Sequence, residues 1–198
     1  MTTSATLRAL SGAVDQPAAL ATSTVVLIDF QNTYTRGEME LEGWDAALDA
    51  AADLLARART AGATVIHVQH DGGAGSAYDI RDDIGAIHER VAPIDGEAVV
   101  VKKAPNSFVG TELGDLVDAA GHEDVVIAGF MTHMCVTYTT EGAFLRGNRP
   151  TVVAAATATR SLPSVAGDVP AEQLHRAALA GIADLYATVV ATVDDLGR

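Results

Sequence analysis

Short runs of β-branched and other apolar residues alternate along the chain with longer, Ala-rich stretches whose apolar residues recur every three or four positions. The short runs are mostly apolar throughout, which is typical of strands that are buried on both faces of a sheet. They predict six strands, at residues 24–29, 63–69, 98–103, 124–130, 151–157 and 185–191.

The Ala-rich stretches predict amphipathic helices between these strands. Within residues 43–62, apolar side chains occur at the helical spacing of Trp44, Leu48, Ala51, Leu55 and Ala58. Further helices are predicted at residues 111–121, with Thr111 as the N-cap, at 135–146, and from 168 onward. Strand and helix therefore alternate, which predicts an α/β fold: a three-layer α/β/α sandwich around a Rossmann-like, six-stranded, mainly parallel sheet.

Two segments depart from this rhythm. Residues 71–96 combine glycines with mixed charges and weak periodicity, as loops that form lids or pocket walls often do. Residues 1–22 show no strong pattern and are expected to be a mobile N-terminal segment. The 198 residues are otherwise expected to form a single domain, 1–198.

The charge composition of the chain argues against two classes of binding partner. The chain has 13 Lys and Arg against 26 Asp and Glu, a net charge of −13, and its basic residues are scattered. This argues against binding to nucleic acid or to anionic membranes. A single cysteine cannot form an intramolecular disulfide, and no apolar stretch reaches the length of a membrane span. We therefore expect a soluble protein of the reducing cytoplasm.

Chemically useful side chains stand at the ends of three predicted strands. Asp29 ends the first, Lys102 and Lys103 end the third, and Cys135 follows the fourth. Ligands of open α/β sheets bind at the carboxyl ends of the strands, so these residues are candidates for nucleophilic catalysis. A helix start and a nearby ammonium are both expected to lower the pKa of the Cys135 thiol. Taken singly, each residue also fits a structural role, for example Cys135 as a small buried hydrophobe.

Three blocks carry a family resemblance: "VVLIDFQNTY" from residue 25, "KKAPNSFVGTEL" from residue 102 and "GFMTHMCVTYTTEGAFLRG" from residue 129. In this order and spacing they resemble the isochorismatase-like cysteine hydrolase superfamily, which includes nicotinamidases and N-carbamoylsarcosine amidohydrolases. The resemblance implies that Asp29 is the catalytic acid and base, that Cys135 is the nucleophile, and that Lys102 completes the triad. Lys103 is the alternative to Lys102. Adjacent side chains of a strand face opposite sides of the sheet, so only one of the two lysines should point into the site.

The resemblance also implies features around the nucleophile. It implies a cis peptide bond between Phe130 and Met131, and an oxyanion hole formed by the backbone N–H groups of Met131 and Cys135. Four further residues near the blocks are candidates for the walls of the substrate pocket: Gln31, Tyr34, Phe108 and His133.

No metal or other cofactor is expected. The nicotinamidases resembled here carry an Asp and His metal cluster after the second strand, but His67, His70 and Asp71 lack the required spacing. A solvated or core-satisfied role is therefore expected for His67, His70 and His88. The presence of Cys135 also argues against cleavage of isochorismate itself, since the resemblance implies that true isochorismatases lack this cysteine.

The resulting hypothesis is a metal-independent cysteine hydrolase that cleaves a C–N bond of a small amide, imide or lactam through a thioester. The expected partners are a small-molecule substrate and further copies of the chain, as a dimer or tetramer. Two alternatives remain open. Cys135 is a redox-active thiol in the first, although no resolving cysteine is present. In the second, the chain is a catalytically idle binding or assembly module of the same fold.

Overall fold

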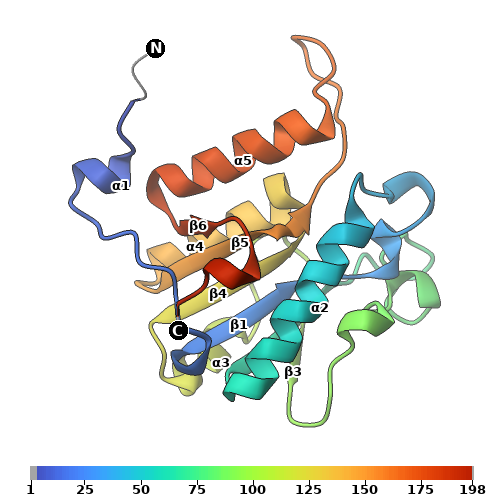
Figure 1. The fold of residues 1–198 in the computed structure, drawn as a ribbon. Helices are drawn as coiled ribbons and strands as arrows, with labels where there is room; N and C mark the ends of the chain where they lie inside the picture. Colours follow the sequence, from blue (N-terminus) through green and yellow to red (C-terminus); the bar gives the residue numbers. More distant parts are fainter. Residues whose placement is uncertain (1–3, 198) are drawn as a thin grey trace.

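A six-stranded sheet forms the centre of the molecule in the computed structural model, which describes residues 4–197 (Figure 1). Its strands are β1 Ser23–Ile28, β2 Thr64–His70, β3 Ala98–Lys102, β4 Asp124–Phe130, β5 Arg149–Ala158 and β6 Thr188–Val190. The spatial order is β3-β2-β1-β4-β5-β6, and every neighbouring pair is parallel. The predicted fold is thus confirmed. Strand order reverses between β1 and β4, which is where such sheets bind ligands.

Helices cover both faces of the sheet. They are α1 Leu7–Leu10, α2 Trp44–Ala61, α3 Leu113–Ala120, α4 Thr137–Leu145 and α5 Ala171–Leu185. In Figure 1, α2 crosses in front of the sheet, whereas α3 and α4 lie behind it. Within residues 4–197, no helix combines the length and the apolar character that a membrane crossing requires.

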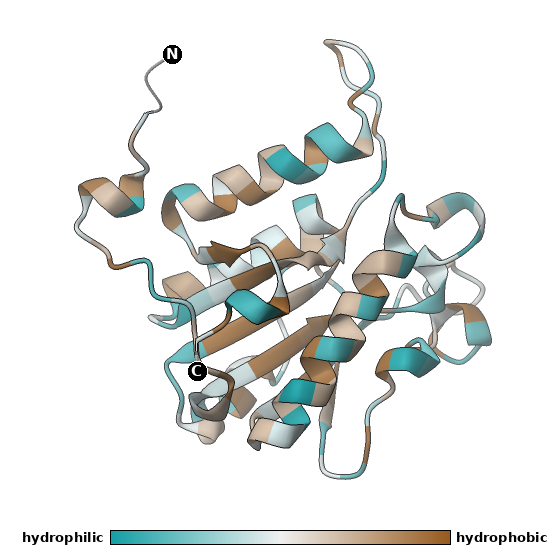
Figure 2. Ribbon diagram, in the orientation of Figure 1, coloured by the Kyte–Doolittle hydropathy of each residue, from teal (hydrophilic) through white to brown (hydrophobic). Residues whose placement is uncertain are grey.

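Two buried clusters fill the space between the layers. Val25 and Leu27 of β1 face one cluster with the apolar side of α2, and Val26 and Ile28 face the other with α3, α4 and α5. All six residues of β1 are buried. This two-sided burial explains the continuous apolar runs, which appear as brown strands in Figure 2, whereas α2 shows alternating teal and brown turns.

Three element boundaries differ from the prediction. The helix α5 extends to Leu185, so β6 has three residues instead of the predicted seven. The N-cap of α3 is Glu112, one residue after the predicted Thr111, although the Thr111 hydroxyl accepts from the amide of Leu113 at 3.3 Å. The helix predicted to start at Cys135 starts earlier, as a π-helical turn over Thr132–Val136 that precedes α4.

The N-terminal segment contacts the body of the protein. The amide of Leu7 donates to the Asp184 side chain at 2.9 Å, and the amide of Ala18 donates to the Thr151 hydroxyl at 3.1 Å. Residues 1–3 lie outside the described part of the chain. The mobility predicted for residues 1–22 and the single domain predicted for 1–198 stay predictions.

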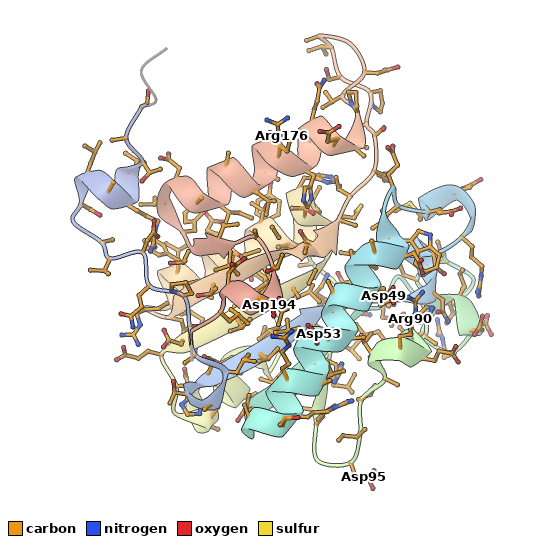
Figure 3. The ribbon with its side chains drawn as sticks, viewed as in Figure 1. Asp49, Asp53, Arg90, Asp95, Arg176 and Asp194 are labelled. Carbon is orange, nitrogen blue, oxygen red and sulfur yellow. The ribbon has the colours of Figure 1, made fainter. Side chains whose placement is uncertain are left out.

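Residues 71–96 form an irregular wall beside the carboxyl ends of the strands, drawn in green in Figure 1. The wall is tied to α2 through Arg90, which forms ion pairs with Asp45 and Asp49. Figure 3 shows Arg90 close to Asp49 on the outer side of α2. Gln69 and Gln31 add hydrogen bonds to the carbonyl of Gly85, at 2.8 and 2.7 Å. The segment is therefore attached at several points along its length.

Candidate active site

Asp29 follows β1 directly and turns the chain at the switch point of the sheet. Its φ angle is 54°, in the left-handed region, which aspartate tolerates better than most residues. Its amide continues the ladder by donating to the carbonyl of Val68 at 2.9 Å. The side chain is fully buried. The turn thus leaves a carboxylate enclosed at the end of the central strand.

Lys102 is the last residue of β3, two strands away from β1, and its side chain reaches across the end of β2. Its Nζ atom lies 2.8 Å from Oδ2 of Asp29 and 3.2 Å from Sγ of Cys135. Lys102 is fully buried, whereas Lys103 is exposed. The structure therefore brings Lys102, and not Lys103, together with the predicted acid and thiol.

Cys135 lies in the π-helical turn and is only 5% exposed. The bond between Phe130 and Met131 is cis, as the resemblance implied. Just before it, Gly129 has a φ of 156°, and a Cβ atom there would lie 2.4 Å from the carbonyl oxygen of Ile28. A glycine is needed at this point because β1 and β4 approach so closely. Within residues 4–197, the Met131 N–H has no hydrogen-bond acceptor, although the Met131 carbonyl accepts from Val136 at 3.2 Å.

Burial controls the protonation of this group. It raises the pKa of Asp29, against the opposing effect of Lys102 and of the nearby thiol. Lys102 stays charged, because Asp29 and Cys135 outweigh its burial and raise the pKa of the ammonium. Burial and the negative charge of Asp29 together raise the pKa of Cys135 to about 12, although Lys102 lowers it. The expectation of a lowered thiol pKa is therefore wrong, and the resting side chain is a neutral thiol.

Asp29 and Lys102 form an ion pair, but their atoms are not oriented for a hydrogen bond. Neither carboxylate oxygen of Asp29 accepts a well-directed hydrogen bond from any residue in the range 4–197. Both oxygens thus keep free acceptor capacity in a closed site. Such a carboxylate is suited to receive a proton.

A third partner of Lys102 was missed by sequence reasoning. The Nζ atom lies 3.4 Å from Nδ1 of His70, the last residue of β2. A structural role was expected for His70, because sequence alone does not say which residues of two strands are paired. In the sheet, His70 pairs in register with Lys102.

Two of the predicted pocket residues lie beside the triad. Tyr34 is 1% exposed and packs edge-on against Phe130, with 5.7 Å between ring centroids. Burial, followed by the charge of Asp29, raises the pKa of Tyr34 well above its usual value. The side-chain amide of Gln31 instead binds the backbone, donating to the carbonyls of His70 and Gly85 at 3.0 and 2.7 Å. Gln31 therefore holds the rim of the site together, and its amide is occupied by backbone groups instead of facing a substrate.

The other two predicted pocket residues are held by neighbouring elements. The Phe108 ring packs under the guanidinium of Arg146, 5.3 Å away, beside α4. His133 shares a hydrogen bond of 2.5 Å with the hydroxyl of Thr159, just after β5. Next to Thr159 stands Arg160, a residue that the sequence analysis did not single out. Its guanidinium lowers the pKa of His133 after the larger effect of burial.

Comparison with known proteins now places the chain. The isochorismatase domain family matches residues 23–194. The chain belongs to the isochorismatase family. It is 38% identical over 174 residues to YddQ, an uncharacterised isochorismatase family protein of Bacillus subtilis, with 86% of this chain and 97% of YddQ covered. A crystal structure of an isochorismatase from Pseudomonas putida matches with a TM-score of 0.95 and 36% identity, covering 98% of this chain and 100% of that one.

Another member of the isochorismatase family is a secreted effector, Isc1 of Verticillium dahliae. It is 32% identical over 188 residues, which cover 94% of this chain and 97% of Isc1. The cytoplasmic location expected for this chain is untested and stays a prediction.

Two further histidines of this isochorismatase family chain have structural partners. His67 is buried and bonds through Nε2 to Glu97 at 2.9 Å. His88 caps a short helical turn by accepting from the amide of Arg90 at 3.2 Å. His67 is thus a core histidine with a satisfied hydrogen bond, as expected, and His88 has a local partner in its own turn. Among residues 4–197, no group of three or more His, Cys, Asp or Glu side chains is arranged to hold a metal ion.

Proposed function

We propose that this protein is a cysteine hydrolase that cleaves a C–N bond of a small molecule through a thioester. The observation that carries the proposal is the convergence of Asp29, Lys102 and Cys135 in one buried group, with Nζ of Lys102 2.8 Å from the carboxylate and 3.2 Å from the sulfur. A base, a cation and a nucleophile at these distances suit acyl transfer. All three are protein groups, so the proposal needs no metal.

In the first half of the reaction, Asp29 accepts the proton of the Cys135 thiol as sulfur attacks the carbonyl carbon. The raised pKa of Asp29 makes its carboxylate a stronger base for this proton, whereas the raised pKa of Cys135 opposes the transfer. Lys102 offsets the negative charge on sulfur during the transfer. In this proposal the carbonyl oxygen, now an oxyanion, accepts hydrogen bonds from the N–H groups of Met131 and Cys135.

In the second half, protonated Asp29 gives its proton to the departing nitrogen. Ammonia or an amine leaves, and the acyl group remains on sulfur as a thioester. The carboxylate of Asp29 then takes a proton from a water molecule that attacks the thioester carbon. The acid product leaves, and the thiol recovers its proton, so one water is consumed for each C–N bond broken.

Named relatives support a C–N bond as the target. Streptothricin hydrolase of Streptomyces noursei is 34% identical over 175 residues, and maleamate amidohydrolase of Pseudomonas putida is 34% identical over 146 residues. A more distant relative, 26% identical over 162 residues, is ureidoacrylate amidohydrolase of Azorhizobium caulinodans. Maleamate is an amide and ureidoacrylate a substituted urea, and both also carry a carboxylate.

A carboxylate on the substrate has a fitting partner in Arg160. Its side chain is half-buried, and within residues 4–197 its Nε atom is buried without a hydrogen-bond partner. The same charge acts on Tyr78, which in turn feels the charges of Asp29 and Cys135. We therefore infer that the substrate carries an anionic group, which Arg160 binds beside His133.

The test is release of ammonia or amine from a panel of small amides, imides and lactams, half of them with a carboxylate. Wild-type protein should turn over at least one compound and accumulate an acyl adduct visible by intact mass spectrometry, and Cys135→Ala should do neither. Arg160→Met should raise KM for carboxylate-bearing amides by roughly 10-fold or more and leave uncharged ones unchanged. Turnover that survives Cys135→Ala would exclude the thiol mechanism, and binding without turnover would favour the idle-module alternative.

A further inference from the structure

The strand between the acid and the lysine ends in an unassigned histidine. Strand β2 lies between β1 and β3, so Lys102 must cross the end of β2 to reach Asp29. His70 is the last residue of β2 and pairs in register with Lys102. Paired residues of neighbouring strands project to the same side of a sheet. The imidazole of His70 is therefore placed directly beside the path of the lysine side chain.

The ammonium of Lys102 has three N–H donors and three close neighbours. It forms an ion pair with Oδ2 of Asp29 at 2.8 Å and hydrogen bonds with Sγ of Cys135 at 3.2 Å and Nδ1 of His70 at 3.4 Å. An N–H of a buried ammonium that lacks an acceptor carries a large desolvation penalty. Within residues 4–197, His70 is the only partner of Lys102 that the proposed reaction does not itself consume or change.

The imidazole is itself held in place. The backbone of His70 is clamped by Gln31, whose Oε1 accepts from the His70 amide at 2.8 Å. Its ring packs edge-on against Tyr78, with 4.9 Å between centroids. Burial and then Lys102 lower the pKa of His70, opposed by Asp29 and Asp71. These groups from β1, β3 and the 71–96 wall leave a neutral ring at pH 7, with a lone pair free to accept.

We propose that His70 is a positioning residue, whose Nδ1 atom accepts the third N–H of Lys102 and holds the ammonium between Asp29 and Cys135. The proton of the neutral ring is then on Nε2. The proposal rests on the proposed function for its catalytic meaning. Its geometry is testable without any substrate, so its failure and the failure of the proposed function are distinguishable.

The first test measures how fast iodoacetamide alkylates Cys135 at neutral pH. His70→Phe keeps a ring against Tyr78 but removes the acceptor, and should slow alkylation about 10-fold, the loss expected for a hydrogen bond to a charged group. His70→Asn restores an acceptor near the Nδ1 position and should recover a rate close to wild type. His88→Phe, a ring substitution away from the triad, is the matched control. Equal rates in His70→Phe and wild type, or failure of His70→Asn to recover the rate, would overturn the proposal.

The second test uses the reciprocal effect of the contact on the histidine. In protein with 15N-labelled histidine, Lys102→Met should raise the pKa of His70, because the cation that lowers it is gone. The Nδ1 resonance should also move as its hydrogen bond is lost. A His70 titration that is identical in the two proteins would show that no such contact exists. Lys103→Met supplies the control, since Lys103 is exposed.

Discussion

Two largely buried groups of ionisable side chains lie along β2 and β3, and they have opposite properties. The Glu97 cluster consists of Arg59, His67 and Glu97 and packs beside α2. The Asp29 cluster consists of Asp29, His70, Lys102 and Cys135 and lies at the carboxyl ends of the strands. Each contains a carboxylate, a cation and a histidine. The proposed function assigns chemistry only to the second, and the two clusters differ in the number of donors around the carboxylate.

In the Glu97 cluster the carboxylate is saturated with donors. It accepts from Nε and Nη2 of Arg59 at 2.7 and 2.8 Å, from the amide of Ile94 at 3.0 Å and from His67 at 2.9 Å. These bonds, Arg59 first, lower the pKa of Glu97 to about 2 despite its burial. The carboxylate is therefore fixed in its charged form, and the cluster serves stability.

In the Asp29 cluster the balance is reversed. Asp29 is fully buried and lies near one ammonium, but its oxygens accept no well-directed hydrogen bond within residues 4–197. Burial then dominates and raises the pKa of Asp29. An under-bonded carboxylate gains and loses a proton easily, whereas a saturated one does not. Burial of a carboxylate alone thus says little about its role until its donors are counted.

The largest effect is expected from Asp29→Asn. Loss of the general base should reduce turnover by about 10²- to 10⁴-fold. Alkylation of Cys135 should become faster, because the charge of Asp29 raises the pKa of the thiol and Lys102 still lowers it. Both rates are measured on the same preparation, with Glu97→Gln as the control that should keep normal turnover. A parallel loss of turnover and alkylation would mean that Asp29 chiefly organises the site and does not move the proton.

The second largest effect is expected from Lys102→Met. Within residues 4–197, Lys102 is the one cation that lowers the pKa of Cys135, so alkylation at neutral pH should slow by roughly 10- to 100-fold. Lys103→Met is the matched control on the adjacent, exposed position and should react like wild type. Slower alkylation in Lys103→Met than in Lys102→Met would reverse the assignment of the lysine.

For the Glu97 cluster, the expected change is in stability and not in rate. Glu97→Gln should lower the free energy of unfolding at pH 7 by about 3 kcal/mol, since each pKa unit is worth about 1.4 kcal/mol. Because the pKa of Glu97 is lowered in the fold, its contribution is present above pH 4.5 and fades toward pH 2. Urea unfolding of both proteins should therefore show a gap that narrows as pH falls. A gap that stays constant would show that the charge of Glu97 is not its source.

The periodicity of apolar residues was enough to predict the strands of the sheet, but not the ends of the helices around the site. The run at 24–29 is continuous because β1 is covered on both faces, so its pattern is visible in one dimension. The π-helical turn before α4 has no such signal, because it depends on the Met131 carbonyl accepting from Val136. The end of α5 was misplaced for a related reason: Leu185 is apolar and suits a strand or a helix equally well.

For the site, the sequence was enough to predict which residues take part, but not their side-chain directions or their pKa values. Asp29 follows β1 directly and Cys135 lies shortly after β4, positions that a sequence reveals directly. Choosing Lys102 over Lys103 required the direction of each side chain, and finding His70 required the register of β2 against β3. The sign of the thiol pKa shift was wrong because it depends on enclosure and on the distance to Asp29, two quantities that no linear pattern contains.

The smallest effect is expected where charged side chains face water. Arg57 on α2 lies 2.9 Å from Asp53 and 2.7 Å from Asp194, and these carboxylates stand close together in Figure 3. Its side chain is 45% exposed, so solvent competes with both contacts. Arg57→Met should change the melting temperature by less than about 2 °C, far less than Glu97→Gln. If both substitutions lowered the melting temperature equally, burial of the charged groups would not explain why one cluster stabilises the fold more than the other.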